Sequence, residues 1–134
     1  MSDWNQRIIE EFRANEGRVQ SFAHQPLLLL THTGARTGRR RTNPLACFRD
    51  GDRYVIVASK GGAPDHPDWY HNLLANPWAT VEVGTQTLDV IAAPATGEER
   101  DRLWATITAQ NPAFAEYADK TTRTIPVVVL TPAE

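Results

Sequence analysis

Two short basic stretches hold the side chains whose types and spacing could do chemistry. Residues 32–44 read HTGARTGRRRTNP and contain four arginines, two glycines and no acidic residue. Residues 58–62 read ASKGG and place one lysine at the end of an apolar run. Guanidinium groups bind phosphates and carboxylates through paired N–H donors, and glycines let backbone N–H groups approach an anion. Together the two stretches predict a site for a compact anionic ligand.

The glycine spacing and the charge distribution narrow the kind of ligand. Gly34 and Gly38 are four residues apart and no Lys-Ser/Thr pair follows, so the stretch is not a P-loop. Residues 33–60 hold seven basic side chains and two acidic ones, whereas the whole chain has a net charge of −2. Such a local cationic face argues against a nucleic-acid partner. The alternative is a solvated arginine-rich loop, which is the state expected of Arg39 and Arg40.

The sequence gives no support for a metal site or for hydrolytic catalysis. The four histidines lack metal-ligand spacing, and Ser59 has neither a neighbouring histidine nor a hydrolase elbow around it. A single cysteine, Cys47, excludes an internal disulfide and fits a reducing compartment. No signal peptide or membrane-spanning run is recognisable. We therefore expect a cytoplasmic protein with no integral membrane segment.

Apolar periodicity predicts the elements that must position these stretches. An amphipathic helix capped by Ser2 covers residues 1–17. Weak association with a membrane surface is an alternative role for this helix, which its acidic polar face disfavours. Hairpin turns are expected at Asp50-Gly51 and Gly84-Thr85. Strands are expected over residues 27–33, 43–49, 53–59, 80–83, 86–92 and 125–132. Further helices are expected over residues 65–77, from residue 96 onward and over 111–120, with capping boxes at Asp65/Asp68 and Thr96/Glu99.

These elements add up to one α+β domain over residues 1–134. About six short, mostly antiparallel strands with flanking helices predict a sheet that curls into a small barrel. In the helix over residues 65–77, Trp69 and Asn72 are three positions apart and share one side. An indole and an amide there suit an aromatic ligand with carbonyl or N–H edges. The alternative is a core tryptophan beside a structural asparagine.

Three segments of the chain resemble a known family. LLLLTHTGARTGRRRTNPL, VASKGGAPDHPDWYHNLLANP and RTIPVVVL are similar to the deazaflavin (coenzyme F420)-dependent nitroreductase family of actinobacteria, and the likeness runs from about residue 5 to residue 132. The resemblance implies a split β-barrel of the FMN-binding type. It also implies that the ligand is coenzyme F420, a deazaflavin with a phosphate and an oligoglutamate tail.

The resemblance assigns roles to particular residues. The phosphate and acidic tail are expected at Arg36, Thr37, Arg41 and Lys60, and the ring system lies beside Asn43 and Pro44 and along the backbone of Val57, Ala58 and Ser59. The complete implied cofactor set is Arg36, Thr37, Arg41, Thr42, Asn43, Pro44, Ala46, Val57, Ala58, Ser59, Lys60, Gly61, Asp68, Trp69 and Asn72. A substrate lid is implied at Asn111, Phe114 and Tyr117. Nitroimidazole-reducing members carry several tyrosines there, whereas this chain keeps only the phenol of Tyr117.

The implied activity is hydride transfer from reduced F420 to a small planar acceptor: a quinone, an enone or a nitro compound. Tyr117 and Ser59 are the expected catalytic residues, as sources of the accompanying proton. Two alternatives remain, namely an FMN-binding split-barrel reductase and a non-catalytic F420 carrier or sensor. The expected state of the chain is a monomer or a homodimer.

Overall fold

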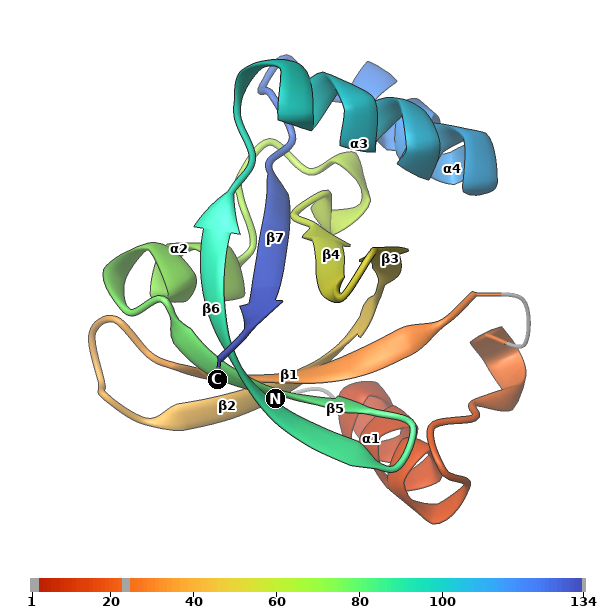
Figure 1. Cartoon of the computed structure of the whole chain (residues 1–134), viewed down its shortest axis with the longest axis vertical. Coiled ribbons are helices and arrows are strands. Elements are labelled where there is room, and N and C mark those ends of the chain that lie inside the picture. Colours follow the sequence, from red (N-terminus) through yellow and green to blue (C-terminus); the bar gives the residue numbers. More distant parts are fainter. Residues whose placement is uncertain (1–2, 23–24, 134) are drawn as a thin grey trace.

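One curled antiparallel sheet organises the molecule. The computed structural model describes residues 3–22 and 25–133, so the cap predicted at Ser2 lies outside the described residues. Within them seven strands follow the order β2-β1-β5-β6-β7-β4-β3, and every strand pairing is antiparallel. Figure 1 shows α3 and α4 above one end of the sheet and α1 at the opposite end. The α+β fold with a curled sheet is confirmed.

The elements have the following bounds. The strands are β1 (Leu27–Thr33), β2 (Arg40–Ala46), β3 (Phe48–Asp50), β4 (Arg53–Val57), β5 (Trp78–Val83), β6 (Gln86–Pro94) and β7 (Val127–Pro132). The helices are α1 (Asp3–Ala14), α2 (Asp68–Ala75), α3 (Gly97–Gln110) and α4 (Ala113–Asp119), with short 3-10 turns η1 (Gln20–Phe22) and η2 (Lys60–Gly62).

Strand β1 shows why the sheet is covered on both faces. All four leucines at its start are buried. Leu27 and Leu29 pack in the cluster under α1, and Leu28 and Leu30 pack in the cluster inside the curled sheet. Successive side chains of a strand point to opposite faces, so a continuous apolar run requires a cover on each side. A third cluster fills the space beneath α3 and α4 and contains Ile107 and Phe114.

The structure differs from the predicted elements in the number of strands. Seven strands are present in the described residues instead of about six, because the run predicted over residues 43–49 divides at Cys47. The backbone N–H of Cys47 donates to the carbonyl of Pro26 at 3.0 Å. After this bond the chain ends its pairing with β1 and enters β3. The two predicted hairpins are confirmed: Gly51 and Gly84 lie in their turns with φ of +64° and +58°.

Both predicted capping boxes are wrong. Pro67, not Asp65, precedes α2, and no side chain caps that helix. Thr96 precedes α3 without a side-chain capping bond. Glu99 instead lies 3.2 Å from the guanidinium of Arg53 on β4. The carboxylate of Glu99 therefore pairs with an arginine of β4 and does not cap the start of α3.

Candidate cofactor site

The first basic stretch forms the turn between β1 and β2. The N–H of Gly34 donates to the carbonyl of Arg39 at 2.8 Å, and the N–H of Gly38 donates to the carbonyl of Gly34 at 2.9 Å. Gly38 has a φ of +69°, which favours glycine. These two backbone hydrogen bonds lie within the turn, and the arginine side chains of the first basic stretch are exposed. Arg36 and Arg41 form no ion pair with any residue that the structure describes.

Buried polar side chains attach this turn to α2. His32 is 2 % exposed; its Nε2 lies 2.6 Å from Oδ1 of Asn43, and its Nδ1 lies 3.1 Å from Nδ2 of Asn72. Oδ1 of Asn72 accepts the backbone N–H of Ala35 at 2.9 Å. Asn72 therefore donates to Nδ1 of His32, and Nε2–H of His32 donates to Asn43. Burial lowers the pKa of His32, and the nearby Arg41 lowers it further.

The two faces of β2 have different surroundings. Asn43 points to the side of His32 and α2. Thr42 lies on the other face, where its hydroxyl is 2.9 Å from that of Thr31, and Ala46 on that face packs against the clusters beneath α1 and beneath α3 and α4. Because strand side chains alternate, Pro44 shares the face of Thr42 and Ala46. Asn43 and Pro44, which the resemblance assigns to the ring system, therefore lie on opposite faces of β2, Asn43 toward α2 and Pro44 on the face that meets α1.

The second basic stretch directly follows β4. Ser59 has right-handed backbone angles, and Lys60, Gly61 and Gly62 all have positive φ, with +47° at Lys60. The Lys60 side chain is exposed, whereas Ser59 is 8 % exposed. A Cβ at Gly62 would lie 2.8 Å from the carbonyl oxygen of Tyr117, so this segment packs directly on α4.

The three residues of the expected lid have different environments. Asn111 is held at the α3–α4 junction, where its Nδ2 donates to Oε1 of Gln25 at 2.9 Å and its Oδ1 accepts the N–H of Ala113. Phe114 is 6 % exposed and packs edge-on against Phe48 in the core. Tyr117 is partly exposed. Among the three, Tyr117 therefore has both a proton to give and access to solvent.

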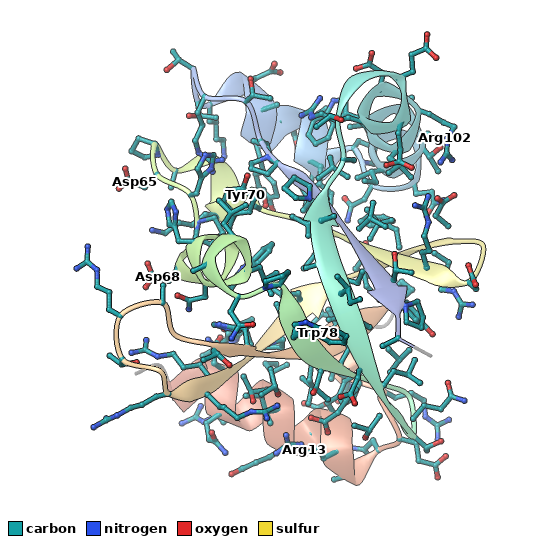
Figure 2. The ribbon with its side chains drawn as sticks, turned by 60° about the vertical axis from the view of Figure 1, so that its left-hand side comes forward. Arg13, Asp65, Asp68, Tyr70, Trp78 and Arg102 are labelled. Atoms are coloured by element: carbon teal, nitrogen blue, oxygen red, sulfur yellow. The ribbon has the colours of Figure 1, made fainter. Side chains whose placement is uncertain are left out.

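Helix α2 lies between the two basic stretches. Trp69 is 5 % exposed and belongs to the central core, so its ring packs within the protein. A solvent-open hollow of about 440 Å³ is lined by Lys60, Pro64, Asp65, His66, Asp68, His71 and Arg123. The charge of Asp68 also acts on His32. Figure 2 shows Asp65, Asp68 and Tyr70 on the side of the molecule where α2 meets the β1–β2 turn.

Sequence reasoning missed Arg123 and His32. Arg123 donates to three backbone carbonyls of residues 58–63 and to His66. Nothing in its local sequence marks it, because its partners lie 57 to 65 positions away. The sequence carries one sign that could have indicated His32: it lies on the same strand as four buried leucines, and a polar side chain in a buried strand needs a hydrogen-bond partner.

Three further observations concern the described residues. No cluster of three or more His, Cys, Asp or Glu side chains suited to a metal ion occurs among residues 3–22 and 25–133. Within the same residues, no helix is long and apolar enough to cross a membrane. Burial raises the pKa of the Cys47 thiol to about 11, so this thiol is a poor nucleophile.

The curled sheet is a half-barrel of the split-barrel type, and exposed arginines lie at the turn between β1 and β2. A family model described as F420H(2)-dependent quinone reductase matches residues 4–132. The chain belongs to this family. The resemblance to F420-dependent reductases is thereby confirmed, and the family description specifies a quinone where the sequence left quinone, enone and nitro acceptors open.

Curated and solved relatives agree with this family. The F420H(2)-dependent quinone reductase Rv1261c of Mycobacterium tuberculosis is 44% identical over 128 residues, covering 90% of this chain and 84% of the relative. A solved F420-H2 dependent reductase, FDR-A, is 43% identical with a TM-score of 0.72, covering 78% of this chain and 93% of that chain. A structure described as a domain-swapped dimer is 39% identical with a TM-score of 0.75, covering 96% and 97%.

The fold extends to more distant proteins. The heme storage protein HutZ of Vibrio cholerae has a TM-score of 0.63 at 15% identity, covering 94% of this chain and 88% of that chain. At such low identity the likeness concerns the curled sheet alone. Function on this fold must therefore be argued from the site.

Proposed function

We propose that this chain is an F420-dependent quinone reductase that binds reduced F420 between the β1–β2 turn and residues 58–62. The observation that carries the proposal is a set of exposed cations that form no ion pair with any described residue: Arg36 and Arg41 in the first basic stretch and Lys60 in the second. A phosphate with a carboxylate-rich tail would neutralise them. The names of the relatives support the choice of F420 as the anion.

The residues present fit such a ligand. The β1–β2 turn holds its own backbone in place by two hydrogen bonds, so its arginines can bind an anion without first ordering the loop. On the face of β2 that carries Thr42, Pro44 and Ala46 the side chains are small and half-buried, and a flat ring could lie against the part of them that stays exposed. FMN is the less fitting ligand, because its single phosphate leaves cations on one side of α2 without a partner.

The chemistry then divides between the coenzyme and the chain. Reduced F420 supplies a hydride, and one hydride plus one proton convert a quinone into a hydroquinone. The chain's task is to hold both reactants in contact and to place a proton donor at the quinone oxygen. The phenol of Tyr117 and the hydroxyl of Ser59 are the candidates, since the η2 segment packs against α4 and brings these two positions to one region.

Binding is tested by titrating F420 and following its fluorescence. Lys60→Ala and Arg41→Ala should each weaken binding about 10-fold, because each removes a charge-assisted contact worth about 1.5 kcal/mol. Arg39→Ala is the matched control, with the same charge change two residues before Arg41, and should bind within about 2-fold of the parent. Affinity should also fall with added salt. Equal losses in all three variants would show a general field effect and refute the assigned contacts.

The proton donor is tested separately at saturating coenzyme. Tyr117→Phe should lower kcat for a quinone about 100-fold while leaving the Kd for F420 unchanged. Ser59→Ala is compared in the same assay, and the larger loss identifies the donor. An unchanged kcat in both variants would assign the proton to water.

A further inference from the structure

We infer that Arg123 is a positioning residue that aims the backbone N–H groups of Ser59 and Lys60 at the anionic ligand. This inference rests on the proposed function, because the ligand in question is the phosphate-bearing coenzyme. Arg123 lies in the connection between α4 and β7 and lines the same hollow as Lys60. The effect on the ligand that we infer is the one that Arg123 exerts through residues 58–63, whose carbonyls it binds.

The guanidinium of Arg123 is almost fully occupied by this one segment. Its Nε donates to the carbonyl of Ala63 at 2.9 Å, its Nη1 to that of Ala58 at 3.1 Å, and its Nη2 to that of Ser59 at 2.7 Å. The other Nη1 proton lies toward Nδ1 of His66, at an N···N distance of 2.9 Å. Four acceptors arranged around one planar fork fix the path of the backbone between them.

The direction of the N–H groups follows from peptide geometry. In a trans peptide the C=O and the following N–H point in opposite directions. Because the carbonyls of Ala58 and Ser59 point at Arg123, the N–H groups of Ser59 and Lys60 point away from it. Neither N–H donates to another group of the described chain. A largely buried Ser59 with an unpaired N–H is costly unless a ligand or water accepts the bond.

The backbone angles and the charge strengthen this arrangement. A right-handed Ser59 followed by a left-handed Lys60 turns successive N–H groups toward one point, which is a geometry that binds anions. Arg123 has no carboxylate within 4 Å among the described residues, so its positive charge polarises the peptides it holds. Burial, and then the charge of Arg123, lower the pKa of His66, which favours the neutral ring that accepts the bond from Arg123.

A lysine at position 123 would keep the charge and lose the fork. Its single ammonium cannot reach acceptors spread over residues 58, 59, 63 and 66 at once. Arg123→Lys therefore separates positioning from charge, and Arg123→Gln removes both. Arg100→Gln is the matched control: Arg100 also donates to a backbone carbonyl of this connection, that of Ile125 at 2.6 Å, and its guanidinium lies over the ring of Trp104.

The first experiment uses inorganic phosphate and backbone amide NMR. In the parent and in Arg100→Gln, the amide signals of Ser59 and Lys60 should shift on addition of phosphate. In Arg123→Lys they should shift several-fold less at the same concentration. Equal shifts in Arg123→Lys and the parent, or no shift in the parent, would overturn the inference. This result does not depend on F420, so it stands or falls separately from the proposed function.

The second experiment uses F420 and a quinone. Arg123→Lys should raise the Kd for F420 10- to 100-fold, with kcat at saturating coenzyme within about 3-fold of the parent and an unchanged KM for the quinone. Its binding should retain the salt dependence of the parent, whereas that of Arg123→Gln should be weaker. A merely structural role would lower thermal stability as Arg100→Gln does while leaving the Kd unchanged. That outcome would also overturn the inference.

Discussion

Replacing His32 by leucine tests whether the buried network behind the cationic turn is what holds α2, β1 and β2 together. The substitution deletes both ring nitrogens while keeping an apolar side chain of similar size. Oδ1 of Asn43 and Nδ2 of Asn72 would lose their partners in a region that is 2 % exposed at His32 itself. The N–H of Ala35, held by Asn72, would lose a fixed acceptor.

The expected cost follows from those two contacts. Each hydrogen bond contributes about 1 kcal/mol net, and a buried group left unpaired costs about 1–3 kcal/mol. The free energy of unfolding should therefore fall by about 2–4 kcal/mol, which corresponds to a Tm lower by about 8–16 °C for a domain of this size. His32→Gln can still donate to Asn43 and should lose about half as much. His71→Leu, at an exposed position of α2, is the control and should change Tm little.

The pH dependence gives this prediction a second readout. Because burial lowers the folded-state pKa of His32 below 6.5, the unfolded chain binds the proton first as pH falls. The parent therefore loses stability below about pH 6.5, by up to about 1.4 kcal/mol per pH unit from this residue, until the folded-state pKa is passed. The leucine variant has no such loss. The difference in the free energy of unfolding between the parent and the leucine variant should therefore become smaller on acidification.

Thermal and urea unfolding at pH 7.5 and at pH 5.5 measure both effects. A leucine variant as stable as the parent at pH 7.5 would show that the network is dispensable. A gap that widens on acidification would mean that His32 is protonated in the folded state. Either result would refute the reasoning.

Three further predictions concern positions away from the candidate cofactor site. Gly17→Ala should lower the free energy of unfolding, measured in urea, by about 2–4 kcal/mol, because the φ of Gly17 is +92° and a Cβ would lie 2.7 Å from Cα of Gly84. Gly51→Ala is the comparison: its φ is +64° but a Cβ there would meet no atom within 4 Å, so the loss should be about 1–2 kcal/mol. The thiol of Cys47, with its pKa raised to about 11, should resist a thiol reagent at pH 8 until the protein is unfolded. Asp50→Asn should cost about 1 kcal/mol at pH 7, a difference that disappears as pH falls from about 4 to 2, since hydrogen bonds from two guanidinium groups lower the pKa of Asp50 to about 2.

Much of the fold follows from local sequence patterns. The apolar stripe of α1, the leucine run of β1 and the Asp50-Gly51 turn each depend on residues close together in the chain. The strand order does not, because β5 lies beside β1 only through pairings such as Leu30 with Val81. The division between β2 and β3 likewise depends on a bond from Cys47 to the distant Pro26.

The sequence predicts which cations belong to the candidate site, but it does not predict the buried polar contacts that hold their segments in place. The composition of the β1–β2 turn predicts an anion site, which stays a prediction, and its arginine side chains are exposed. His32, Arg123 and the bond between Asn111 and Gln25 join residues up to 86 positions apart. Such contacts satisfy buried polar groups, and only the folded chain determines which distant partner is in reach.

Steady-state oxidation of reduced F420 by a quinone tests the central claim most directly. The purified chain, reduced F420 and a soluble benzoquinone or naphthoquinone are mixed without oxygen, and the appearance of oxidised F420 is followed by its fluorescence. We predict saturable, quinone-dependent oxidation, with kcat/KM for F420 about 10-fold lower in Lys60→Ala and near the parent value in Arg39→Ala. A folded protein that binds F420 and shows no quinone-dependent oxidation would contradict the account.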